Sequence, residues 1–152
     1  DEAHSREIIK RGLELGVNFF DTAIGYQSGT SEQYVGRAVR DFAKREDVVV
    51  ATKFLPRTPD EIAAGVTGRQ HIEQMVNTSL KNLGLDYIDL YIYHMWDYET
   101  PLWDIMDGST AWCRRARCGT SASPTASPTS SPRPMRWRKK RAFRSSSRFR
   151  AL

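Results

Sequence analysis

The chain has 152 residues, 23 of them Lys or Arg and 18 Asp or Glu, for a formal net charge of +5 at pH 7. Residues 1–108 hold 18 acidic and 11 basic side chains, a formal charge of −7, whereas residues 109–152 hold 12 basic side chains and no acid. The length suits one domain, and the absence of a membrane-length apolar run, a signal segment and a cysteine or histidine cluster leads us to expect a cytoplasmic protein without disulfides or metal.

The first part of the chain begins with a predicted helix and strand. Apolar residues at helical spacing follow Ser5, and Gly16 can end that helix in a left-handed conformation. A strand is predicted over Val17–Ala23. Thr30 and Gln33 have the spacing of a capping box and predict the start of a second helix. Its expected buried stripe comprises Tyr34, Val35, Ala38, Val39 and Phe42.

The middle of the chain repeats this order. The β-branched run Val48–Phe54 is typical of a buried parallel strand. After a loop rich in Pro and Gly, Thr67 and Gln70 predict another capping box, and the helix that follows is expected to end at Gly84. Its expected buried residues are Ile72, Met75, Val76, Leu80 and Leu83.

A third strand is predicted over Tyr87–His94, followed by a helical segment that begins over Pro101–Met106, with Pro near its first turn. Helices and strands therefore alternate through residues 1–108. This alternation favours an α/β fold with a parallel sheet or barrel.

Polar side chains stand at or near the ends of these strands, where α/β folds place their chemistry. Asp21 ends the first strand, Lys53 lies near the end of the second, and His94 closes the third. Tyr26 follows Asp21 on the next loop. Each residue alone has an ordinary structural explanation, such as a cap, a solvated strand end or a buried hydrogen-bonded histidine. Their occurrence at three successive strand ends predicts a shared site.

At these positions the sequence closely resembles the aldo-keto reductase family, NADPH-dependent carbonyl reductases built on a (β/α)8 barrel. The matching stretches cover about residues 4–108. They are Phe-Asp-Thr-Ala-x-x-Tyr at 20–26, Gly-x-Ser-Glu at 29–32, Ala-Thr-Lys at 51–53, and Leu-x-x-Leu-Gly-x-x-Tyr-Ile-Asp-Leu at 80–90 running on to His94. Gln27 departs from the family pattern, where many members have Gly, and bears on loop shape more than on chemistry.

The resemblance implies a catalytic tetrad. Tyr26 would be the general acid, Lys53 and Asp21 its modulators, and His94 would orient the substrate carbonyl. Asp21 is also assigned to cofactor binding, the cofactor being NADPH, and Trp96 to the substrate pocket. A phenol is a weak acid at neutral pH, and a neighbouring ammonium makes its proton easier to release. The expected partner is a small carbonyl compound, with no membrane and no specific nucleic acid.

A complete barrel of this kind needs about 250 residues. Residues 1–108 supply about three βα units, so the predicted fold is a partial (β/α)8 TIM barrel, with the remaining strands and most of the cofactor-binding residues missing. We therefore expect this polypeptide by itself to be inactive. A regulatory fragment that pairs with a partner stays open as another interpretation, although no residue supports it specifically.

Residues 109–152 are predicted to form a second region, a disordered basic tail. The segment holds 13 Ser or Thr, 12 Lys or Arg and four Pro in 44 residues, without helical or alternating apolar periodicity. One interpretation is a nucleic-acid-binding arm, with Trp112, Trp137 and Phe143 as stacking residues.

The alternative interpretation is a frameshift near residues 107–110. If the codons of residues 118–140 are read in another frame, they permit the Gly-Ile-Ser-Asn motif of the family's fifth strand, followed by a plausible amphipathic helix. Agreement over more than 20 consecutive positions favours this second interpretation. It also accounts for the loss of acidic residues, because a shifted frame has no selected charge balance.

Overall fold

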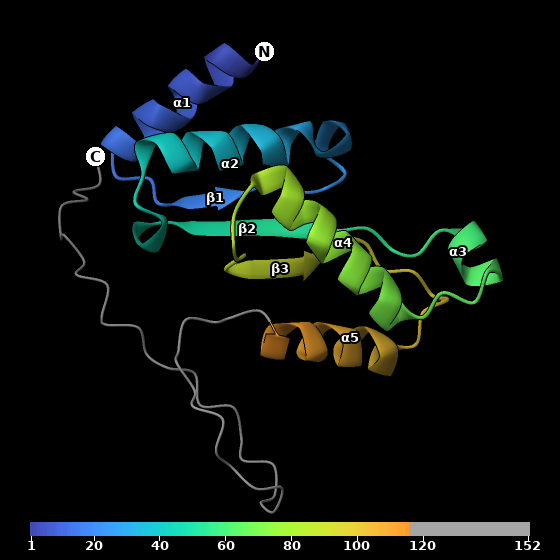
Figure 1. Ribbon diagram of the computed structural model, residues 1–152. Helices are drawn as coiled ribbons and strands as arrows, with labels where there is room; N and C mark the ends of the chain where they lie inside the picture. Colours follow the sequence, from blue (N-terminus) through green and yellow to red (C-terminus); the bar gives the residue numbers. More distant parts are fainter. Residues whose placement is uncertain (116–152) are drawn as a thin grey trace, which may run out of the picture. The chain divides into compact units, whose positions relative to one another are not determined.

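A computed structural model describes residues 1–115, which form a three-stranded parallel sheet and five helices (Figure 1). The strands are β1 (Phe19–Asp21), β2 (Val49–Phe54) and β3 (Leu90–Tyr93). The helices are α1 (Glu2–Glu14), α2 (Thr30–Phe42), α3 (Pro59–Ala63), α4 (Gly68–Leu83) and α5 (Leu102–Arg115). Two short 3-10 turns, Tyr26–Gly29 and Arg45–Asp47, lie on either side of α2.

The sheet has the order β1-β2-β3, and both pairings are parallel. At least one helix lies between each strand and the next along the chain, which is the repeating βα unit of parallel α/β folds. The α/β class predicted from the sequence is thus confirmed. Two strands are shorter than predicted: the first covers only Phe19–Asp21, and the third covers only Leu90–Tyr93.

The main hydrophobic core lies where α2 and α4 cover the sheet. It comprises Val39 from α2, Val48 and Val50 at β2, Val76 and Leu83 from α4, and Ile88 before β3. A second cluster joins Phe54, Ile72 and Ile105, so that α5 packs against α4 and the end of β2. β2 is the central strand, and most of its side chains are buried. Its position explains why its sequence is rich in β-branched and other apolar residues.

The start of α2 differs from the prediction. Thr30 is the first residue of the helix, and the cap is Gly29, in a left-handed conformation with φ 86° and no side-chain hydrogen bond. The predicted capping box at Thr30 is therefore wrong: the preceding turn closes tightly onto the helix and leaves no extended residue there. Of the predicted buried stripe, Ala38 and Val39 are fully buried, whereas Phe42 is 37% exposed.

A capping box does form at Thr67 and Gln70, as predicted, and Gly84 ends α4 with φ 60°. A second one, not predicted, opens α3, where Thr58 and Glu61 satisfy each other's backbone N–H groups. His71 of α4 ties this short helix in place. Its Nδ1 lies 3.0 Å from the Glu61 carboxylate, and its Nε2 lies 2.8 Å from the Leu55 carbonyl oxygen.

Helix α5 continues to Arg115, through the boundary at residue 108 that the sequence predicts. Residues 116–152 lie outside the described part of the chain, and with them most of the predicted basic tail, the stacking residues Trp137 and Phe143, and the stretch that carries the frameshift hypothesis. Those predictions remain predictions. None of the helices within residues 1–115 is long and apolar enough to cross a membrane.

Candidate active site

The Lys53 ammonium is the centre of the candidate site. Its Nζ donates to the Asp21 carboxylate at 2.8 Å, to the Thr22 carbonyl oxygen at 3.0 Å and to the Tyr26 hydroxyl at 3.4 Å. Asp21 and Lys53 come from neighbouring parallel strands, and β1 and β2 pair as far as Asp21 with Ala51. The Asp21 and Lys53 side chains thus meet at one end of the sheet, as the sequence predicts.

Partner charges set the protonation of Lys53. Burial lowers the pKa of its ammonium, but the Asp21 carboxylate and the Tyr26 oxygen both favour the charged form, and their combined effect raises the pKa above 10.5. The Lys53 side chain is only 12% exposed, whereas that of Asp21 is 49% exposed. Lys53 is thus a fixed cation with all three N–H groups engaged.

Tyr26 reaches Lys53 from a tight turn. Gln27 and Ser28 follow it with φ values of 48° and 54°, in the left-handed region that non-glycine residues seldom adopt. This turn leaves the Tyr26 ring 42% exposed. One side of the ring borders an open groove of about 770 Å³ between α1 and α2, lined also by Ile8, Ile9, Tyr34 and Val35.

His94 approaches Tyr26 from the end of β3. Its backbone N–H donates to the Phe54 carbonyl oxygen at 2.9 Å, which fixes the residue just beyond the sheet ladder. The rings of Tyr26 and His94 meet edge to face, with 5.6 Å between centroids and 76° between planes. The Nδ1 atom of His94 is buried and has no hydrogen-bond partner within residues 1–115. The structure therefore brings together all four residues of the predicted tetrad.

Trp96, predicted to line the substrate pocket, lies on the loop that follows His94. Its ring is 52% exposed and packs edge to face on Tyr93, with 6.2 Å between centroids. Met95 and Tyr98 on the same loop are also exposed. The loop thus carries apolar surface close along the chain to His94.

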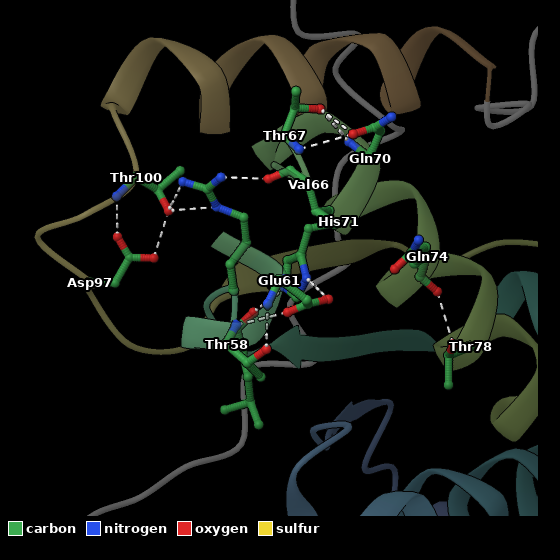
Figure 2. A network of polar contacts seen from close by, with 12 residues as sticks. Thr58, Glu61, Val66, Thr67, Gln70, His71, Gln74, Thr78, Asp97 and Thr100 are labelled. Atoms are coloured by element: carbon green, nitrogen blue, oxygen red, sulfur yellow. Dashed lines mark hydrogen bonds and ion pairs between the residues drawn. The ribbon is translucent and has the colours of Figure 1, made fainter. Parts of the chain in front are cut away.

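Sequence reasoning missed the polar network that holds this loop (Figure 2). Asp97 accepts hydrogen bonds from Tyr93, Glu99 and Thr100, and Thr100 accepts from the Arg57 guanidinium. The Asp and Thr three residues apart could have indicated a side-chain-stabilised turn. No sequence signal pairs Arg57 with a loop 43 residues away.

Comparisons with known proteins agree with this geometry. The pattern of the aldo/keto reductase family matches residues 1–112. An aldo-keto reductase of Bacillus subtilis, YhdN, is 38% identical over 102 residues, which are 67% of this chain and 31% of that protein. The holo form of a Bacillus halodurans aldo-keto reductase has a TM-score of 0.65 at 32% identity, covering 76% of this chain and 39% of that one.

A third relative was solved with its cofactor. The aldo/keto reductase of Klebsiella pneumoniae, in complex with NADP and acetate, has a TM-score of 0.64 at 25% identity, over 76% of this chain and 37% of that one. The chain spans about a third or less of the curated relatives it matches. The described sheet and helices therefore correspond to part of a TIM barrel, as predicted. With the family pattern matched over most of its length, the chain belongs to the aldo/keto reductase family.

Proposed function

We propose that this site serves the NADPH-dependent reduction of an aldehyde or ketone to an alcohol. The observation that carries the proposal is the position of the Lys53 ammonium, which contacts both the Asp21 carboxylate and the Tyr26 hydroxyl. Reduction of a carbonyl places negative charge on its oxygen, so a proton donor must stand ready at that atom. Tyr26, which is 42% exposed, is the weak acid of this arrangement.

Each residue of the site has a role in this proposal. Tyr26 gives its proton to the carbonyl oxygen, and the Lys53 charge stabilises the phenolate that remains. Asp21 keeps Lys53 charged and in place. His94 donates a hydrogen bond to the same carbonyl oxygen, and the contact of its ring with the Tyr26 ring supports this role.

The exposed carboxylate of Asp21 fits a hydroxyl-rich cofactor. Its Oδ2 accepts from Lys53, while its Oδ1 accepts no hydrogen bond within the described residues and is available to a ribose hydroxyl. When bound, the nicotinamide supplies the hydride. The choice of NADPH is supported by the Klebsiella pneumoniae relative, which was solved with NADP.

We further propose that the 152-residue polypeptide by itself does not catalyse this reduction. It covers less than two fifths of each solved relative compared above, and residues 1–115 provide three strands of sheet. A barrel with fewer strands offers less surface to a dinucleotide and leaves its apolar interior uncovered. NADPH oxidation by the purified polypeptide, lost in Tyr26→Phe, would contradict this proposal.

The chemistry of the site is tested in a chimera in which residues 1–112 replace the matching segment of the Bacillus subtilis relative. Tyr26→Phe should lower kcat for a carbonyl substrate by about 10²–10⁴-fold, the usual contribution of a positioned acid. Tyr34→Phe, which changes another tyrosine of the same groove, should leave kcat within about twofold. Equal activity of the two variants would overturn the role of Tyr26.

A second candidate function, nucleic-acid binding, is favoured by the 12 basic and no acidic residues of 109–152. Such binding should be independent of base sequence and fall by orders of magnitude between low and moderate salt. Because an accidental basic segment would bind in the same way, sequencing the DNA for residues 103–117 decides its origin. An inserted or missing base followed by a barrel-like open frame would establish the frameshift, and a clean frame would favour the basic arm.

A further inference from the structure

Three consecutive carbonyl groups at the end of β2 are bonded to different parts of the chain. The first two, those of Lys53 and Phe54, accept from backbone N–H groups that follow β1 and β3, at 3.0 and 2.9 Å. The third, that of Leu55, accepts from a side chain instead, the Nε2 of His71 on α4, at 2.8 Å. This last bond fixes the backbone just beyond the strand, two residues after Lys53.

The partners of the His71 ring decide how many protons it carries. The Leu55 carbonyl oxygen can only accept, so Nε2 donates. Nδ1 lies 3.0 Å from the Glu61 carboxylate (Figure 2). The Thr58 backbone N–H and the His71 ring hold the pKa of Glu61 below 4.5, against the effect of burial, so this carboxylate also only accepts at neutral pH. Nδ1 therefore donates as well, and the ring is an imidazolium.

Burial makes this pair of contacts selective. The His71 ring is only 4% exposed, and a charge so far from water needs a counter-charge beside it. Glu61 supplies it. Two more charged side chains lie near the start of α4, Arg57 from beyond β2 and Asp104 from α5, and both bind backbone groups there. The ring is thus held between the Glu61 carboxylate and the end of β2.

Leu55 carries this constraint to the candidate active site. A Cβ built on Gly25 would stand 3.5 Å from the Leu55 Cδ1 and 3.7 Å from its Cδ2, so the Leu55 side chain packs on the Gly25 backbone. Gly25 directly precedes Tyr26, whose hydroxyl lies 3.4 Å from the Lys53 Nζ. One residue therefore joins the His71 ring to the turn from which Tyr26 reaches Lys53.

We propose that His71, donating from both ring nitrogens, is a positioning residue for Tyr26. It fixes the Leu55 carbonyl, which keeps the Leu55 side chain against Gly25 and thereby sets the distance between the Tyr26 hydroxyl and the Lys53 ammonium. The catalytic value of that distance rests on the function proposed above, since it takes Tyr26 as the general acid.

The first experiment counts the protons on His71 by nuclear magnetic resonance of the 152-residue chain, labelled with isotopic histidine. Its signals are assigned by their loss in His71→Gln. At neutral pH both ring nitrogens should carry a slowly exchanging proton, whereas the exposed ring of His4 should exchange rapidly. In Glu61→Gln the new amide can donate to Nδ1, so this nitrogen alone should lose its proton. A bare ring nitrogen in the wild-type chain would overturn the proposal.

The second experiment follows Tyr26 in the same chain, labelled with fluorotyrosine. Its fluorine resonance is assigned by its loss in Tyr26→Phe. His71→Met, which is apolar and of similar length, should shift and broaden this resonance. His71→Gln, whose amide can still donate to the Leu55 carbonyl oxygen, should restore it. Gln74→Met, the matched change at an exposed position of the same helix, should leave it in place.

Tyr87 is an internal control, because its ring lies ahead of β3, 3.8 Å from the Arg45 guanidinium. Movement of both tyrosine resonances in His71→Met would mean general loosening and would overturn the proposal, and an unmoved Tyr26 resonance would overturn it equally. Should His71→Met fail to fold, Leu55→Ala decides. It should shift the Tyr26 resonance while His71 keeps both protons, and an unmoved resonance would again overturn the proposal.

The third experiment measures turnover in the chimera described above. His71→Met should lower kcat by about tenfold and leave KM within about twofold, because a misplaced acid slows the chemical step, and His71→Gln should restore kcat. A higher KM with unchanged kcat would contradict a role through Tyr26. The two resonance experiments need no turnover: a chimera without reductase activity, together with a Tyr26 resonance that depends on His71, would refute only the reductase assignment.

Discussion

Gly36 lies where α2 crosses the end of α4, and adding one methyl group there should destabilise the fold. A Cβ at this position would stand 1.9 Å from the Leu83 carbonyl oxygen and 2.7 Å from the Leu83 Cα. Both atoms belong to the backbone, so the two helices would have to part by about 1.5 Å to restore an ordinary contact of 3.4 Å. The same carbonyl oxygen accepts from Arg40 at 2.9 Å, and moving it would weaken that bond.

The magnitude follows from three effects. Overpacking costs about 1–3 kcal/mol, and a weakened hydrogen bond from a charged donor costs about 1.5 kcal/mol more. The higher helix propensity of alanine offsets about 1 kcal/mol of this loss of stability. We expect Gly36→Ala to lower the free energy of unfolding by about 1.5–3.5 kcal/mol, measured by urea unfolding of the 152-residue chain followed by circular dichroism.

Gly12 of α1 provides the matched control. A Cβ there would lie 3.7 Å from the Val17 Cβ, which is an ordinary contact. Gly12→Ala should therefore stabilise the chain by about 0.5–1 kcal/mol through propensity alone. A Gly36→Ala variant as stable as Gly12→Ala would refute the close approach of α2 and α4.

Three further predictions concern single side chains. Thr67→Ala should lower the free energy of unfolding by about 1 kcal/mol because it removes a helix cap. Thr30→Ala, within the helix, should change it by less than about 0.5 kcal/mol. Equal losses in the two variants would mean that Thr30 is itself the cap and that α2 begins one residue later. Gln27→Gly should stabilise the chain by about 0.5–1 kcal/mol by relieving a left-handed residue, and a lower melting temperature would argue against that conformation. The Thr58 backbone hydrogen bond and His71 lower the pKa of Glu61, so its stabilisation is complete above pH 4.5 and lost as the pH falls through the lower folded-state value. In urea titrations across pH, the stability difference between wild type and Glu61→Gln should vanish on acidification, and a difference that persisted would contradict this.

The sequence predicts the site better than it predicts the ends of helices. Asp21, Lys53 and His94 could be placed together because strands that run parallel bring their carboxyl ends to one edge of the sheet. Capping is less certain, because Thr30, Thr58 and Thr67 share one residue spacing and only the last two act as caps. The backbone conformation of the residue before the helix decides between these outcomes, and spacing does not encode it.

Arg57 shows a different limit. Its contact with Thr100 depends on where two separate loops run once the sheet has formed. Periodicity and motif spacing describe neighbours along one element, so they carry no information about such a pair. The hydrogen bonds that join Arg57, Thr100 and Asp97 could therefore not be predicted from the sequence.

The three contacts of Lys53 have a consequence for reactivity. A primary amine condenses with aldehydes and ketones through its lone pair, and a protonated amine has none to offer. With its N–H groups directed to Asp21, Thr22 and Tyr26 and its pKa raised, Lys53 meets a carbonyl compound as an ammonium. The arrangement that places a cation beside the phenol thereby also protects the site from forming imines with the compounds it would handle.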